Sequence, residues 1–125
     1  LRVVGDRRWK RSWRGPVPPA DAGRMLESLC TGPCVEKWRH RVPVGAHVFE
    51  VDEFLGDNAG LVLAEVELGA EDEAFERPGW LGEEVTEVPR YYSFLLAERP
   101  FLAWSAAARA AARQGRHRAD PEDPA

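Results

Sequence analysis

Charged side chains occupy every second position in three segments between residues 36 and 68, and each segment carries charges of one sign. The first segment is cationic and carries Lys37, Arg39 and Arg41. The second and third segments are anionic: the second carries Glu50 and Asp52, and the third carries Glu65 and Glu67. Because successive side chains of a β-strand point to opposite faces, the charges of each segment would share one face of a sheet. The simplest interpretation is a half-solvated sheet with its apolar face inward and its charges in water.

Two features favour a binding site instead. A solvated face usually mixes both signs of charge, whereas here the signs are segregated by strand. Glu65 and Glu67 also lie within the apolar run LVLAEVEL, which is typical of a strand buried on both sides. Two such carboxylates are costly unless a cation meets them. That cation is either a nearby lysine or arginine or a hard ion such as Mg²⁺ or Mn²⁺, which takes oxygen ligands.

Short turns connect the three segments, so we expect two consecutive β-hairpins. Residues 44–46 form a tight connection around Gly45, and residues 55–60 form a longer turn rich in Gly, Asp and Asn. Antiparallel pairing would bring the cationic strand beside the first anionic strand, and that strand beside the second. Residues 1–5 read as the end of another strand, on which Arg2 is either a ligand on the same face or a solvated edge charge.

Helices are expected on both sides of these strands. Asp21 resembles an N-cap for a helix over residues 22–30, with Met25, Leu26 and Leu29 facing the sheet. Trp80 is expected to anchor an acidic loop to the core. A second helix is expected over residues 90–99, with these inward residues: Tyr91, Phe94, Leu95 and Leu96. Residues 104–125 are rich in Ala and Arg, without an apolar stripe, and are expected to be helical and then to fray into a disordered tail.

Composition narrows the classes of protein. The 125 residues suffice for one domain, and the net charge of −4 gives no general reason to bind nucleic acid or membranes. Residues 7–19 interleave cations with tryptophan, but a mobile basic loop explains them better than nucleic-acid binding does. We expect no membrane span and no signal peptide. Cys30 and Cys34 lack further zinc ligands and are expected to be free thiols in a reducing cytoplasm.

Four motifs resemble a known family. They are E-K-x-R at residues 36–39, F-E-V-D-x-F at 49–54, G-L-x-x-A-E-V-E-L at 60–68 and P-x-W-L-G-x-E-V-T at 78–86. Together they are similar to the C-terminal half of CYTH domains, the triphosphate tunnel metalloenzyme superfamily, and above all to its short bacterial members. The likeness covers residues 1–103, weakly before Pro18 and strongly from Asp21 onward.

The resemblance implies an α+β fold in which an antiparallel barrel forms a tunnel lined by charges, with packing helices. It implies metal-dependent hydrolysis of inorganic, thiamine or nucleoside triphosphates, with Mg²⁺ or Mn²⁺ as cofactor. Carried over by motif, Arg2, Lys37 and Arg39 correspond to phosphate-binding positions. Asp52, Glu65 and Glu67 correspond to the acidic, metal-linked positions, and Arg41 and Glu50 are additional tunnel candidates.

The chain also departs from the family pattern. The signature E-x-E-x-K strand is absent, as are the T-x-K-G and R-x-E-x-E strands that usually precede the helix. We therefore expect an incomplete, N-terminally truncated CYTH-like domain over residues 1–103, with weak or no hydrolysis. Two alternatives remain open: a polyphosphate- or nucleotide-binding module without turnover, and a degenerate interaction protein whose open sheet edge pairs with a partner, for example as a homodimer.

Overall fold

The computed structural model describes residues 1–5, 23–26, 35–70 and 72–118, with the side chains of residues 23–26, 93 and 94 excepted. The expected basic loop at residues 7–19 and the expected free thiols of Cys30 and Cys34 lie outside the described residues.

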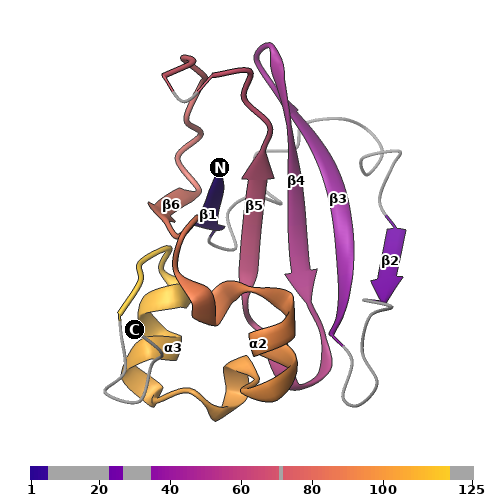
Figure 1. The fold of residues 1–125 in the computed structure, drawn as a ribbon, viewed down its shortest axis with the longest axis vertical. Coiled ribbons are helices and arrows are strands. Elements are labelled where there is room, and N and C mark those ends of the chain that lie inside the picture. Colours follow the sequence, from indigo (N-terminus) through magenta and orange to yellow (C-terminus); the bar gives the residue numbers. More distant parts are fainter. Residues whose placement is uncertain (6–22, 27–34, 71, 119–125) are drawn as a thin grey trace.

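The described strands form one antiparallel sheet of six strands in the order β2-β3-β4-β5-β1-β6 (Figure 1). Their bounds are β1 Arg2–Gly5, β2 Gly23–Leu26, β3 Glu36–Val44, β4 His47–Phe54, β5 Val62–Val66 and β6 Leu81–Glu84. The three predicted central strands and the first strand are confirmed, and the two hairpins join β3 to β4 and β4 to β5 as expected. Gly45 supports the first turn with a positive φ of 60°, which costs other residues strain.

Two apolar clusters sandwich the sheet. On one face Phe49, Val51 and Ala64 pack against Trp80, which is 2% exposed, so the expected anchoring of the acidic loop is confirmed. On the other face Phe54 and Leu63 pack against the helices. Strand β5 therefore contributes to both clusters, which confirms burial on both sides for residues 61–64, whereas Glu65 is half-buried and Glu67 is exposed.

Short helices cover the lower end of the second face in Figure 1. The 3-10 helix η1 spans Gly56–Asn58, η2 spans Pro89–Tyr91 and η3 spans Phe101–Ala103, while the α-helices are α2 at Ser93–Glu98 and α3 at Ala106–Arg113. The helix expected over residues 90–99 is thus present as η2 followed by α2. Of its predicted inward residues, Tyr91 and Leu96 are fully buried. The charged side chains predicted from the sequence lie on the same face of the sheet, beyond these helices.

The helix expected over residues 22–30 is wrong for residues 23–26, which form strand β2 and pair with β3 from Gly23↔Arg39 to Leu26↔Glu36. The physical reason is that β3 would otherwise expose a row of unpaired backbone groups, and pairing outweighs the weak helical preference of a short segment. Strand β6 has no alternating pattern that predicts it, and it pairs with β1 through an irregular register between Val3 and Gly5.

The segment after residue 103 also differs from expectation. Helix α3 does have an apolar stripe, because Trp104, Ala108 and Ala112 follow at intervals of four and are 2–3% exposed within the helix-side core. An alanine stripe is hard to recognise when nearly every neighbour is also alanine. Residues 106–113 are therefore packed and not a solvated tail, and residues 119–125 lie outside the described part.

Among the described strands, β2 and β6 are the two edges and do not pair, so this part of the fold is an open sheet and not a closed barrel. Within the same residues no helix combines the length and apolar character needed to cross a bilayer.

Candidate functional site: a charged row across four strands

The strand register lines up four charged residues. Arg41 on β3 lies opposite Glu50 on β4, Glu50 lies opposite Glu65 on β5, and Glu65 lies opposite Arg2 on β1. Directly opposed residues of antiparallel strands share one face, so the four form a cation–anion–anion–cation sequence, which we call the charged row. No pair of neighbouring strands alone would produce it. It requires β1, which comes from a distant part of the chain, to pair with β5.

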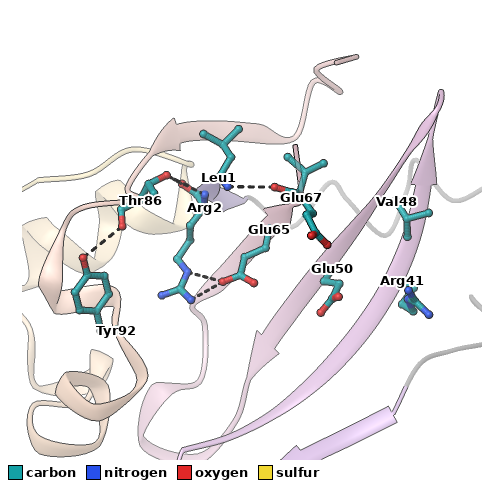
Figure 2. A pocket seen from close by; sticks show the side chains of 10 residues that line it. Leu1, Arg2, Arg41, Val48, Glu50, Glu65, Glu67, Thr86 and Tyr92 are labelled. Carbon is teal, nitrogen blue, oxygen red and sulfur yellow. Dashed lines mark hydrogen bonds and ion pairs between the residues drawn. The ribbon is translucent and has the colours of Figure 1, made fainter. Parts of the chain in front are cut away.

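The charged row lines a groove of about 650 Å³ (Figure 2). Glu67, Thr86 and Tyr92 also line it, and Val48 adds an exposed apolar patch beside Arg41. The side chains of Glu50 and Glu65 are each 37% exposed, so their carboxylates remain open to an ion that enters the groove.

Arg2 is held in a fixed orientation. Its Nε donates to Oε1 of Glu65 over 2.8 Å, its Nη2 contacts the same oxygen, and its Nη1 donates to the carbonyl oxygen of Tyr91 over 3.2 Å. The backbone is fixed as well, because its N–H donates to the Thr86 hydroxyl over 3.0 Å. A guanidinium with so many contacts is positioned before any ligand arrives, which lowers the entropy lost on binding.

A second group of charges, Lys37, Arg39 and Asp52, lies beside the groove. Lys37 Nζ is 3.0 Å from Asp52 Oδ2, and Arg39 forms a two-bond contact with the same carboxylate, Nε to Oδ1 at 2.7 Å and Nη2 to Oδ2 at 2.9 Å. Lys37 and Asp52 are 3% and 5% exposed, so each charge needs its partner. We call these three residues the buried ion cluster.

Arg39 links the buried ion cluster to the charged row. Its Nη1 is 2.8 Å from Oε2 of Glu50. The hydrogen bond with Asp52 raises the pKa of Arg39 above its ordinary value, against the opposing effect of burial, and the charges of Asp52, Glu50 and Glu65 act in the same direction as the bond. These contacts favour the charged form of the guanidinium.

The residues predicted from the sequence thus fall into two sets. The residues that line the groove are Arg2, Arg41, Glu50, Glu65 and Glu67. The residues that form the buried ion cluster are Lys37, Arg39 and Asp52. The predicted metal ligands are divided between the sets, because Asp52 faces the two cations while Glu65 and Glu67 face the groove. Where the structure describes side chains, it gathers no group of three His, Cys, Asp or Glu residues suited to a metal ion.

The carboxylates of the groove still match the chemistry of a hard ion. Mg²⁺ keeps several waters and is usually bound through one or two carboxylates together with the phosphates of a substrate. Glu50 and Glu65 supply two carboxylates from directly opposed positions, and Glu67 lies on the same wall of the groove. This donor set suits Mg²⁺ or Mn²⁺ shared with a phosphate and does not suit an ion held by protein alone.

Sequence reasoning missed the groups that orient Arg2. Thr86 falls in the V-T end of a quoted motif, so its position was visible, but its role as a backbone partner of β1 depends on the unexpected pairing with β6. The Tyr91 carbonyl is a main-chain group, and no residue type could have indicated it. Tyr92, the residue directly before α2, also lines the groove.

The chain is similar in sequence to two curated proteins. The chain is 45% identical over 85 residues to an inorganic triphosphatase of Acetivibrio thermocellus, in an alignment that covers 68% of this chain and 54% of that protein. It is 46% identical over 77 residues to an inorganic triphosphatase of Nitrosomonas europaea, covering 58% of this chain and 50% of the relative. The chain therefore spans about half the length of the curated relatives it matches.

The chain is also similar to one solved structure, that of the inorganic triphosphatase NE1496, with 44% sequence identity and a TM-score of 0.49. The alignment covers 54% of this chain and 48% of that chain. No family model matches the sequence.

Proposed function

We propose that the groove binds the triphosphate group of inorganic triphosphate or of a nucleoside triphosphate together with Mg²⁺ or Mn²⁺, and that the chain supports slow hydrolysis of the bound anion. The observation that carries the proposal is the charged row, with two carboxylates between two guanidinium groups on one groove wall. The two relatives named inorganic triphosphatase support the same substrate class.

The order of charges along the row suits a metal–polyphosphate complex. A bare polyanion would meet the carboxylates of Glu50 and Glu65 at the centre of the groove and be repelled. When a divalent ion is bound there, it neutralises phosphate charge and polarises the phosphorus for attack by water. Glu50, Glu65 and Glu67 line the groove, and one or two of these carboxylates would hold this ion together with oxygens of the phosphate.

The flanking cations have a separate role. Arg2 and Arg41 stand at the two ends of the row, which lets each guanidinium contact phosphate oxygens on its own side of the central carboxylates. Arg39, already 2.8 Å from Glu50, lies next to the groove and would contribute its fixed positive charge. Lys37 faces Asp52 within the buried ion cluster, so we propose that it acts chiefly by holding that cluster in place.

Slow turnover follows from the shape of the described fold. Among the described strands β2 and β6 do not pair, so this part of the fold walls the groove on one side, where dissolved ions would screen its charges. Efficient phosphoryl transfer needs donors around the whole phosphate group. We expect a kcat below about 1 s⁻¹, at the slow end of the usual range for enzymes.

Phosphate release from tripolyphosphate tests the proposal. The purified chain should release phosphate when Mg²⁺ or Mn²⁺ is present and stop when EDTA is added. The double substitution Glu65→Gln, Glu67→Gln keeps side-chain size but removes the proposed ligands, and should lower the rate by about a hundredfold.

The matched control is Glu83→Gln, Glu98→Gln, which removes the same charge at exposed positions outside the groove and should leave the rate unchanged. Equal loss of activity in both double variants would contradict the assignment of the groove.

A second candidate is a binding module without turnover, and it is favoured by the lack of a three-ligand group among the described side chains. Metal-dependent binding of tripolyphosphate by calorimetry, with no phosphate released over hours, would support this candidate over hydrolysis. The third alternative, pairing through a sheet edge at β2 or β6, predicts a dimer that persists without ligand in light scattering.

A further inference from the structure

Residues Gly115–Arg118, which we call the C-terminal strap, cross the β6 edge of the sheet close to the site. The strap begins where α3 ends: Gly115 has a positive φ of 77°, and its N–H donates to the Ala112 carbonyl over 3.0 Å. This is the usual way for glycine to reverse a chain after a helix. The Gly115 carbonyl then accepts a 2.7 Å hydrogen bond from the N–H of Glu83 on β6.

The approach of the strap to β6 depends on Gly82. A Cβ atom placed on Gly82 would lie 1.9 Å from the Gly115 carbonyl oxygen, well inside contact distance. The two glycines therefore let two backbones come closer than side chains would permit. Such close packing fixes where the next residues of the strap can reach.

Beyond Gly115 the strap contacts two residues of η2. Nδ1 of His117 is 2.8 Å from the hydroxyl of Tyr91, and the two rings meet edge to face with centroids 5.4 Å apart. The Arg118 carbonyl accepts a 3.2 Å hydrogen bond from Arg90, whose guanidinium lies 3.7 Å from the ring centroid of Trp104. Tyr91 and Arg90 are 1% and 5% exposed, so the strap holds two buried residues of η2.

Tyr91 also contacts the site, through its main-chain carbonyl group. Its carbonyl oxygen accepts a hydrogen bond from Nη1 of Arg2, on the side of the guanidinium away from Glu65. We propose that the C-terminal strap positions Arg2 through Tyr91, with His117 as the residue that fixes the tyrosine ring. This inference rests on the proposed function for its kinetic consequence, because Arg2 is a proposed phosphate contact.

The mechanical link is short and stiff. The Tyr91 ring packs edge-on against Trp104 at 5.3 Å between centroids, and the His117 contact fixes its hydroxyl end. Ring and carbonyl belong to one residue at the end of a tight 3-10 turn, so release of the anchored ring would let the main chain of Tyr91 shift and carry its carbonyl with it. Arg2 would then keep Glu65 as a partner but lose the contact that sets the rotation of its guanidinium.

A test that needs no substrate reads the ¹H–¹⁵N signal of Arg2 Nε by NMR. His117→Ala should shift and broaden this signal, and Tyr91→Phe, which keeps the ring and removes the hydroxyl, should do the same. His117→Asn, which returns a polar atom near the position of Nδ1, should restore it. The control Arg116→Ala changes an exposed residue of the same strap and should leave the signal in place.

Kinetics supply the second measurement. His117→Ala should raise the KM for tripolyphosphate by about threefold to tenfold, the effect of one lost hydrogen bond, with little change in kcat, and His117→Asn should reverse most of it. An Arg2 signal unchanged in both His117→Ala and Tyr91→Phe would overturn the inference. A shifted signal in a chain that neither binds nor hydrolyses tripolyphosphate would retain the positioning role and refute the proposed function instead.

Discussion

Asp52 is the carboxylate that pairs with both cations of the buried ion cluster. It accepts from Lys37 and Arg39 at 2.7–3.0 Å while almost fully buried. A buried ion pair adds little to stability compared with apolar packing, but removing one partner leaves the others desolvated without compensation. The carboxylate therefore matters more for keeping two cations in place than for any net attraction.

Asp52→Asn should lower the free energy of unfolding by about 3 kcal/mol, because the amide keeps the size of the side chain and removes its charge beside two cations. Urea unfolding followed by tryptophan fluorescence measures the change. Asp57→Asn is the control, since Asp57 is exposed in η1 and should change stability by less than about 0.5 kcal/mol. Equal stability of Asp52→Asn and the wild-type chain would contradict the cluster.

Glu73 gives a pH-dependent prediction at the same scale. The hydrogen bond from His47 at 2.7 Å, and then that from the Gly69 N–H, hold the pKa of Glu73 below its ordinary value. A carboxylate with a folded-state pKa below the unfolded one contributes stability above the unfolded pKa and loses it as pH falls through the folded pKa. In a ¹³C NMR titration, His47→Ala should raise the pKa of Glu73 toward its ordinary value. An unchanged midpoint would show that the bond does not persist in solution.

At the scale of elements, periodicity identified the strands whose own residues alternate and failed where a partner decides the structure. Strands β3, β4 and β5 could be predicted with their order because charges alternate along them and glycine-rich turns join them. Strand β2 could not, because four residues carry too little pattern and the pairing with β3 selects the conformation. The charged row could be predicted over β3, β4 and β5, whereas the residues alone left Arg2 open between a ligand on the same face and a solvated edge charge, because its place depends on a long-range pairing.

Helix α3 gives a prediction about an element. The Ser105 hydroxyl accepts a 3.1 Å hydrogen bond from the N–H of Ala108, which caps the helix that completes the core. Ser105→Ala should lower the free energy of unfolding by about 1 kcal/mol, whereas Ser105→Asp, which can still accept the bond, should retain stability. Urea unfolding of the two variants separates them, and equal destabilisation would mean that the hydroxyl does not cap α3.

At the scale of the whole molecule, a chain with a net charge of −4 binds an anion only where its charges are locally arranged to do so. The arrangement is created by three parts of the chain: the hairpins that bring the anionic strands together, β1 that supplies Arg2, and the helices with the C-terminal strap that close one end of the sheet. A closed tunnel was implied by resemblance, and the described sheet is open at β2 and β6.

An open groove predicts strong dependence on salt. The side chains of Arg2, Glu50 and Glu65 are 28–37% exposed, so dissolved ions screen them readily. Raising NaCl from 0.05 M to 0.5 M should weaken tripolyphosphate binding on the order of tenfold, because the screening length falls from more than about 10 Å to about 4 Å. Calorimetry at a fixed concentration of Mg²⁺ measures this, and an affinity independent of salt would point to an enclosed site or to apolar contacts.

The central claim is that a metal–triphosphate complex occupies the groove over the charged row. Its most direct test is an NMR titration of the ¹⁵N-labelled chain with tripolyphosphate in the presence of Mg²⁺. The account predicts that the largest shifts fall on Arg2 Nε and on the amides around Arg41, Glu50 and Glu65, with little change near His47 and Glu73. Shifts confined to residues outside the groove, or no shifts at millimolar ligand, would contradict it.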